Sequence, residues 1–233
     1  MKKFKWISDF LKHPKQFIGW ESLSDILPNE FDDYFLIHWN VGIVENYPFE
    51  DYPEQLESIE EINEGIRIDK ENNLFFNPNV DQLFKQTTLK KIALMFSQPY
   101  DRDLLYNIKQ TPAIKLLGAE TIVNLKKTIH QLSKGEKLNL FVLDDPRNYI
   151  FAEHNKEEPK QLMSDISVEE YFYWQEWFNF DYYTYLFPSD RKWCLTTSEG
   201  LPMFLCLNKE LNVKELADNK VELFRIKYDE SFY

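Results

Sequence analysis

The amino-acid sequence predicts an α+β fold, with N-terminal and central helices and a C-terminal antiparallel sheet that forms a meander. Three patterns indicate this class: apolar residues at helical spacing through the middle of the chain, two-residue alternation toward its end, and turn signals between the last segments. The 233 residues can bury a substantial core, and no low-complexity linker or break in composition divides them. We therefore expect one α+β domain over residues 1–233.

The N-terminal part predicts two helices and a strand. Apolar residues on one face indicate a short helix over residues 3–13, which Pro14 ends. Residues 31–38 carry aromatic side chains at helical spacing, so we expect a helix there as well. Residues 39–44 are expected to turn into a strand.

The next segment predicts a third helix and a hairpin. Pro53 occupies a position typical of the first residue of a helix, and acidic residues nearby suit the helix dipole. The apolar stripe of this helix consists of Leu56, Ile59, Ile62 and Ile66. Gly65 is expected near its end, and residues 66–68 and 74–76 then flank the polar turn of a hairpin.

Two long helices are predicted in the centre of the chain. The first has Asn79 as its N-cap and runs from residue 80 to residue 97, ahead of Pro99. The second begins at Thr111-Pro112 and runs to residue 133, with Gly118 as a candidate point of division.

The last part predicts strands around one helix. Residues 137–143 alternate in polarity, and we expect them to pair with residues 149–153 across an Asp-rich turn, ahead of an exposed polar loop. Ser167 and Glu170 form a capping-box signature for a helix over residues 168–178. Pro, Gly and Asp then mark turns among short strands. These predicted strands are residues 182–187, 192–197, 203–207 and 221–228.

Charge and hydropathy narrow the class of partner. The formal net charge is −12, from 39 acidic and 27 basic residues, so phosphate backbones and anionic lipids are repelled. We expect no nucleic-acid or membrane partner and a basic surface on any protein partner, although plain solubility also explains the acidity. No apolar stretch approaches the roughly 18 residues of a membrane span, and no signal-peptide core follows the N-terminal lysines. We therefore expect a cytoplasmic protein.

Aromatic residues are abundant, with 19 Phe, 13 Tyr and 6 Trp against 6 Gly. A ring-rich core explains most of them, because each ring buries a large area. Rings on two faces of the predicted helix over residues 168–178 are either buried on both sides or exposed on one. An exposed set would line a ligand pocket or a partner surface. The candidate residues of such a site are Trp174 and Trp177 of this helix, with Trp193 of the predicted strand over residues 192–197.

Motifs that carry chemistry are few. The sequence has no GxGxxG, Walker A, GxSxG or HExxH pattern and no cysteine–histidine cluster, so we predict no cofactor and no metal site. Asp144 and Asp145, with His154, are the candidate catalytic residues of a hydrolase or metal-dependent enzyme, although paired Asp residues are also typical of a plain turn. Cys194 and Cys206 lie in neighbouring predicted strands, where they form either a cross-strand disulfide or two buried free thiols.

One part of the sequence resembles a known family. The motifs are Trp20-Glu21-Ser22-Leu23, a Leu-Pro pair within residues 27–36, Trp39-Asn40-Val41-Gly42, and the run over residues 56–62. Together they look like the opening of SMI1/KNR4-like (SUKH) domains, although Val41 interrupts the Asn-Gly of that family. The resemblance implies a binding protein, often an immunity protein that neutralises a toxin. An acidic surface would suit a basic nuclease as the toxin.

Three functions follow as expectations. The first is a non-enzymatic protein-binding protein, of the immunity type if the resemblance holds. The second is a hydrolase or metal-dependent enzyme that uses the pair Asp144 and Asp145. The third is a small-ligand binder with an aromatic pocket around Trp174, Trp177 and Trp193. The sequence indicates no oligomeric state.

Overall fold

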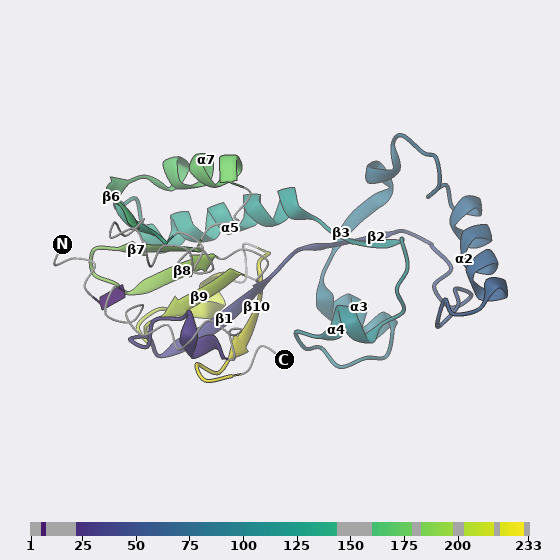
Figure 1. The fold of residues 1–233 in the computed structure, drawn as a ribbon, viewed down its shortest axis with the longest axis horizontal. Coiled ribbons are helices and arrows are strands. Elements are labelled where there is room, and N and C mark those ends of the chain that lie inside the picture. The colour runs from purple at the N-terminus through teal and green to yellow at the C-terminus, as the bar shows by residue number, and fades with distance from the viewer. Residues whose placement is uncertain are drawn as a thin grey trace, which may run out of the picture. The chain divides into compact units, whose positions relative to one another are not determined.

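The computed structural model describes most of the chain, namely residues 6–7, 22–143, 160–178, 183–197, 203–216 and 220–230. It combines helices with antiparallel sheets, which confirms the predicted α+β class. Contacts divide the chain into two compact units, and Figure 1 labels many of their helices and strands. Unit 1 comprises Met1–His38 and Asn124–Tyr233, and unit 2 comprises Trp39–Val123. Every residue of unit 2 belongs to the described part of the chain.

Unit 1 contains a seven-stranded antiparallel sheet in the order β10-β1-β9-β8-β7-β5-β6. Its strands are β1 (Asp33–His38), β5 (Leu138–Leu143), β6 (Lys160–Ile166), β7 (Tyr183–Pro188), β8 (Trp193–Thr197), β9 (Met203–Leu207) and β10 (Glu222–Ile226). A short helix, α8 (Val213–Leu216), precedes β10. Strands β7, β8 and β9 are neighbours both in the chain and in the sheet, so the predicted meander is confirmed for these three.

Strand β1 corrects the helix that the sequence predicts over residues 31–38. It pairs with β9 on one side and with β10 on the other, so a segment from the start of the chain interrupts the meander. Tyr34 and Leu36 face one side of the sheet, whereas Phe35 and Ile37 face the other. Because this sheet is covered on both faces, apolar residues occur on both sides of β1. The resulting run of apolar residues also matches the spacing expected of a helix.

Strand β5 also differs from the expectation. Its predicted partner, residues 149–153, lies outside the described residues, as does the predicted loop that follows. Both edges of β5 are paired, one with β6 and the other with β7, so the pairing predicted for residues 137–143 is wrong. Strand β6 contains several polar residues, so its sequence lacks the regular apolar alternation that predicts a strand. Polar residues suit its position at the edge of the sheet.

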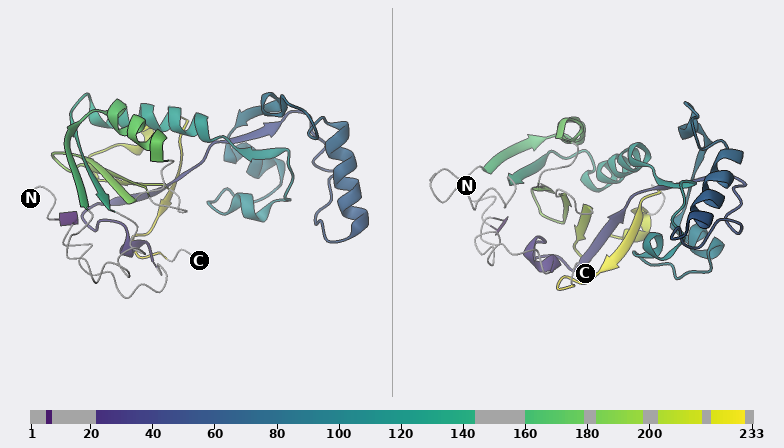
Figure 2. Two further views of the ribbon diagram at one scale, coloured as in Figure 1. Left: turned by 45° about the horizontal axis from the view of Figure 1, so that its top comes forward. Right: turned by 45° about the vertical axis from the view of Figure 1, so that its right-hand side comes forward.

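Different parts of unit 1 cover the two faces of its sheet. Helix α7 (Val168–Phe178) and the C-terminal part of α5 (Gly118–Ser133) lie on one face of the sheet, as both Figure 1 and Figure 2 show. Residues 22–31, which include the 3-10 helix η2 (Leu23–Asp25), pack on the other face. Tyrosine hydroxyls fasten this segment to the sheet, with Tyr34, Tyr185 and Tyr228 donating to the carbonyls of Pro28, Ile26 and Ser24 at 2.9, 2.9 and 3.4 Å.

Two local predictions in unit 1 can be compared directly. Ser167 caps α7 as predicted, because the Glu170 amide donates to the Ser167 hydroxyl at 3.1 Å and the Ser167 amide donates to the Glu170 carboxylate at 2.6 Å. Of the helix predicted over residues 3–13, residues 6–7 are described, and they are helical.

Cys194 and Cys206 lie directly opposite each other in β8 and β9. Both are fully buried and both are free thiols, so the disulfide alternative does not apply to this structure. Burial raises the pKa of Cys194 to about 12 and also raises the pKa of Cys206, with a smaller contribution from the facing sulfur. The pair therefore acts as two small apolar residues in the core.

Unit 2 is built on a three-stranded antiparallel sheet in the order β3-β2-β4. Its elements are β2 (Val41–Val44), α2 (Ile59–Glu71), the 3-10 helix η3 (Val80–Leu83), β3 (Phe84–Thr87), α3 (Leu89–Met95), α4 (Leu104–Asn107) and β4 (Ile114–Leu116). The strand predicted near residues 39–44 is confirmed as β2. A small core joins α2 to this sheet, and its buried residues are Val44, Tyr47, Tyr52, Ile68 and Ala113.

The two long helices predicted for the centre of the chain are both shorter. Residues 80–97 form η3, β3 and α3 rather than one helix. Asn79 makes no side-chain capping bond, whereas the Thr88 hydroxyl accepts from the Lys91 amide at 3.2 Å and begins α3. The second predicted helix begins at Gly118, the candidate point of division, and the residues before it form β4.

Helix α2 begins later and ends later than predicted. It starts at Ile59 rather than near Pro53, and it continues through the first strand of the hairpin predicted over residues 66–76. Asn72 caps its end, and Asn73 then adopts a left-handed conformation with a φ of 58°. The polar turn expected in the hairpin is therefore the C-terminal end of this helix.

Candidate protein-binding surface

The site residues predicted from the sequence all belong to unit 1. Three of them lie outside the described residues, namely Asp144, Asp145 and His154. Trp193 lies in the core at 1% exposure, and Trp174 is half-buried on α7. Trp177 belongs to α7, but its side chain is outside the described set. The aromatic site around these three rings stays a prediction.

A buried polar cluster occupies the place where α7 meets the sheet of unit 1. The Gln175 amide nitrogen donates to the Tyr171 hydroxyl at 2.9 Å and lies 3.2 and 3.4 Å from the hydroxyls of Thr184 and Thr197. All four side chains are fully buried, and burial raises the pKa of Tyr171 to about 12. The amide nitrogen of Gln175 and the three hydroxyls pair with one another and hold α7 on β7 and β8, whereas Gln175 Oε1 is buried without a hydrogen-bond partner among the described residues.

Most of the exposed large apolar side chains of the described residues belong to unit 2. The described residues expose twelve large hydrophobic side chains, and eleven of them belong to unit 2. These are Leu56, Ile59, Ile62, Phe75, Phe76, Leu94, Met95, Tyr100, Tyr106, Leu116 and Val123. Single exposed hydrophobic residues are normal on a protein surface, but their concentration in one compact unit makes unit 2 the candidate for an interaction surface.

Helix α2 carries the first of these groups, and a capping box sets where it begins. The Ser58 hydroxyl accepts from the Glu61 amide at 3.1 Å, and the Ser58 amide donates to the Glu61 carboxylate at 2.9 Å. Hydrogen bonds from Ser58 hold the pKa of Glu61 below its usual range. Because the box fixes the first turn, Ile59 and Ile62 fall within the first two turns of the helix.

One face of α2 is buried through the core contacts of Ile68 and through polar contacts. The buried residues of the helix are Gly65, Ile68 and Asp69. A Cβ atom at Gly65 would lie 3.1 Å from the Tyr52 hydroxyl, so glycine permits the close approach of that ring. The Tyr47 hydroxyl donates to the Asp69 carboxylate at 2.6 Å. Burial raises the pKa of Asp69, and Tyr52 is a second hydrogen-bond partner. These contacts fix which face of α2 turns inward.

The apolar stripe of α2 consequently faces solvent. Ile59 is 73% exposed and Ile62 is 41% exposed, while Ile66 is half-buried. The spacing of these three residues places them along one line of the helix. Leu56, just before the helix, is 42% exposed and approaches the position of Gly65. The sequence identifies the residues of this stripe, but not whether the stripe is buried.

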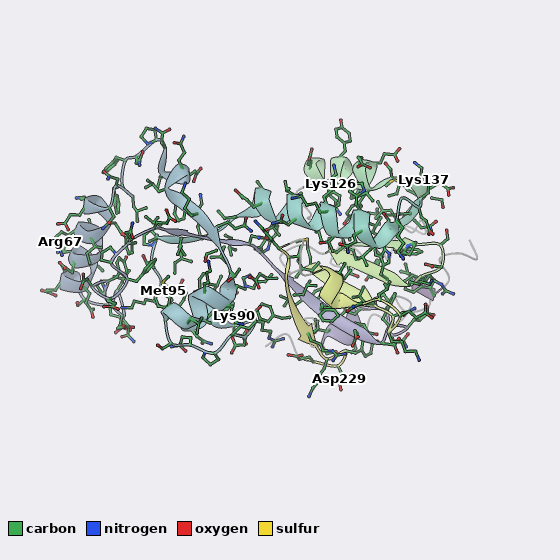
Figure 3. The ribbon with its side chains drawn as sticks, turned by 180° about the vertical axis from the view of Figure 1, so that it is seen from behind. Arg67, Lys90, Met95, Lys126, Lys137 and Asp229 are labelled. Carbon is green, nitrogen blue, oxygen red and sulfur yellow. The ribbon has the colours of Figure 1, made fainter. Side chains whose placement is uncertain are left out.

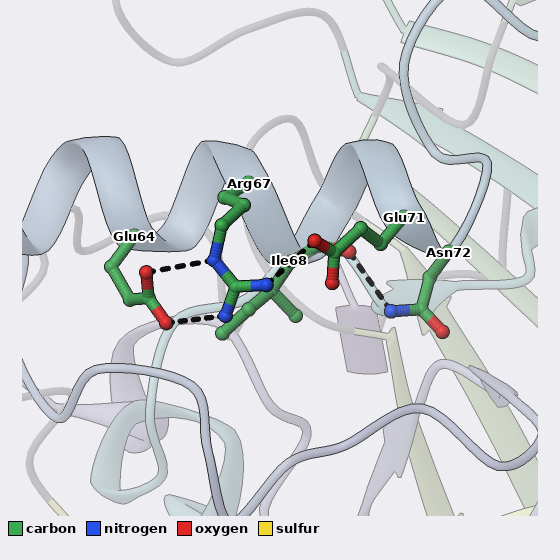
Figure 4. A network of polar contacts seen from close by, with 5 residues as sticks. All are labelled: Glu64, Arg67, Ile68, Glu71 and Asn72. Carbon is green, nitrogen blue, oxygen red and sulfur yellow. Dashed lines mark hydrogen bonds and ion pairs between the residues drawn. The ribbon is translucent and has the colours of Figure 1, made fainter.

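Carboxylates dominate the chain around the stripe. Residues 45–71 contain ten acidic and two basic side chains. Arg67 is bound by Glu64 and Glu71, each at 2.6 Å, as Figure 4 shows. Five further carboxylates are exposed and have no ion-pair partner within the described ranges, namely Glu45, Glu50, Asp51, Glu57 and Glu60. This density of acidic residues is the sequence signal that could have indicated an exposed segment.

Two other apolar patches occur in unit 2. The rings of Phe75 and Phe76 contact each other after α2, with centroids 6.0 Å apart. Phe76 is 95% exposed and has a φ of 54°, a left-handed conformation that is unusual for an aromatic residue. Leu94 and Tyr106 are 74% and 85% exposed near α3 and α4, and Met95 at the end of α3 can be located in Figure 3.

Among the residues that the structure describes, no group of three or more His, Cys, Asp and Glu side chains is placed to hold a metal ion. No helix in these ranges has both the length and the hydropathy that a membrane span requires.

Comparison of the chain with protein-family models, with curated proteins and with solved structures finds no match. The resemblance of residues 20–62 to SUKH domains therefore stays a prediction. The fold and the exposed surface of unit 2 are the observations on which a functional proposal can rest.

Proposed function

We propose that this chain is a non-enzymatic protein-binding protein and that unit 2 carries its binding surface. The observation that carries this proposal is the concentration of exposed large apolar side chains in unit 2. Protein interfaces bury such side chains at their centre, where aromatic and aliphatic anchors supply most of the affinity. Removing them from water is favourable, so a partner that covers them gains stability from their burial.

Charge supports a protein partner over nucleic acid or an anionic membrane. The net charge of −12 repels both phosphate backbones and anionic lipids. A cytoplasmic location fits this proposal, and an immunity-type role rests on the SUKH resemblance alone. The enzyme alternative has no supporting observation, because Asp144, Asp145 and His154 lie outside the described residues.

Affinity capture from the native host with paired surface variants tests the proposal. Three double variants each remove one patch of unit 2: Ile59→Ser with Ile62→Ser, Phe75→Ser with Phe76→Ser, and Leu94→Ser with Tyr106→Ser. All six side chains are exposed, so these variants should fold. Tyr173→Ser is the matched control, since Tyr173 is 63% exposed on unit 1.

The expected result is that the wild-type chain and the Tyr173 variant recover the same protein in equal yield. At least one double variant should lose it, as judged by quantitative mass spectrometry. Equal recovery by all variants, or a loss confined to the Tyr173 variant, would overturn the assignment of binding to unit 2.

A further inference from the structure

The stripe on α2 supports a more specific inference about the partner, which rests on the proposed function. We infer that the occupant of this stripe is a basic amphipathic helix of another protein. That helix would carry apolar residues along one face and Lys or Arg residues beside them. The shape of the stripe, its charge and the properties of the other patches each support this assignment.

The shape of the stripe favours a helix as the occupant. Ile59, Ile62 and Ile66 form a ridge along α2 that is about 10 Å long, or two helical turns. The backbone groups of α2 are paired within the helix, so the surface offers side chains and no strand edge. A ridge of this kind packs into the groove between side chains of another helix, where apolar residues three and four positions apart flank it.

The charge around the stripe favours a basic occupant. Glu60 directly follows Ile59 and Glu57 lies two residues before it, and both are exposed without an ion-pair partner in the described ranges. Arg67 is already bound by two carboxylates of its own helix, and Lys70, four residues after Ile66 on the line of the stripe, is the other cation of residues 45–71. Cationic side chains beside the apolar face of a partner would therefore meet opposite charge, which speeds association and selects the partner.

Other occupants fit these observations less well. A second copy of this chain that packed stripe to stripe would bring together two segments that each contain ten acidic and two basic residues. An anionic membrane would be repelled for the same reason. The remaining patches of unit 2 lack this charge, since residues 72–123 contain four acidic and six basic side chains. A basic helix should thus select the α2 stripe over the other apolar patches.

Synthetic helices test the inference with the full-length chain. The probe is a fluorescein-labelled peptide of about 18 residues, five helical turns, with Leu on one face and Lys on the other. One comparison peptide has Glu in place of Lys, and another has the Lys and Leu residues in scrambled order. Fluorescence anisotropy should give a Kd for the amphipathic Lys peptide that is about tenfold lower than for either comparison peptide.

Variants locate the binding site of the peptide. Ile59→Ser with Ile62→Ser should raise the Kd of the Lys peptide about fivefold or more, whereas Phe75→Ser with Phe76→Ser should change it by less than about twofold. Glu57→Gln with Glu60→Gln should weaken binding and flatten its dependence on salt, because two screened attractions are lost. Equal binding of the scrambled peptide, or no effect at Ile59 and Ile62, would overturn the inference.

Two further measurements separate this inference from its competitors. Sedimentation velocity that finds a wild-type dimer and a monomeric Ile59→Ser, Ile62→Ser variant would assign the stripe to a second copy. Co-sedimentation with anionic vesicles that depends on the same residues would assign it to a membrane. Partner capture that survives loss of the α2 stripe but fails without Phe75 and Phe76 would end this inference and leave the proposed function intact.

Discussion

The two units place their apolar side chains differently. In unit 1 the sheet has a packed layer on each face, and every residue of β8 and β9 is buried. In unit 2 the small sheet shares a modest core with α2, which buries Gly65, Ile68 and Asp69 while Ile59 and Ile62 face water. Isoleucine is thus inside and outside on the same helix. Apolar spacing therefore marks a face that must be covered, but it does not say which molecule covers it.

Substitution of one aromatic residue in each unit should give the largest difference in the free energy of unfolding. Phe204→Ala empties a fully buried position in unit 1, so it should lower the free energy of unfolding by about 3–5 kcal/mol. Phe76→Ala removes a ring that is 95% exposed and should change stability by less than about 0.5 kcal/mol. Urea denaturation of both variants measures the contrast, and similar losses would mean that Phe76 packs against the protein.

Loss of the hydrogen bond between Tyr47 and Asp69, which holds α2, should have the next largest effect on stability. Tyr47→Phe keeps the ring but removes the hydroxyl that donates to Asp69 at 2.6 Å. Asp69 is 3% exposed, so the loss of one of its hydrogen bonds should cost about 1–3 kcal/mol. Hydrogen exchange should be faster in α2 and unchanged in β8 and β9. An unaltered exchange rate in α2 would show that this hydrogen bond does not hold the helix.

The N-cap of α2 should contribute less. Ser58→Ala removes the hydroxyl that accepts from the Glu61 amide and should cost about 1 kcal/mol. Ser58→Asp keeps an acceptor at the same place and should preserve stability. Thermal unfolding of the pair measures the difference, and equal melting temperatures for the Ala and Asp variants would contradict the role of the capping box.

The smallest effect should be a change of stability with pH that depends on Asp69. Burial raises the pKa of Asp69, so the folded chain holds this proton more tightly than the unfolded chain, where the pKa is about 3.9. Wild-type stability should therefore rise relative to that of Asp69→Asn as the pH falls from about 7 toward about 4. Denaturation of both proteins across this range tests the sign. If this stability difference does not change, or if it falls as the pH is lowered, the pKa of Asp69 is not raised in the folded chain.

The parts of the fold that depend on neighbouring residues could be predicted. The capping box at Ser167 and the strands β7, β8 and β9 are bounded by local turn and cap signals. Strand β1 could not be predicted, because its partners β9 and β10 lie at the other end of the chain. Residues 80–97 have apolar spacing suited to one helix, yet Thr88 begins a shorter one after β3.

The candidate surface could be predicted only in part. The stripe of α2 is evident from its spacing, but its orientation depends on Asp69, a polar residue with no local signal for burial. Its partner Tyr47 is 22 residues away, so the contact exists only once the chain has folded. The sequence places its candidate binding residues at the rings of unit 1, of which Trp193 belongs to the core.

The two cysteines have a practical consequence for work on α2. Cys194 and Cys206 are the only thiols in the sequence, and both are sealed in the sheet of unit 1 with raised pKa values. A cysteine introduced at Asn63, an exposed position on α2, would be the one thiol that a maleimide dye reaches in the folded protein. The natural sequence is thus already a suitable background for single-site labelling, and a dye at that position would report occupancy of the helix directly.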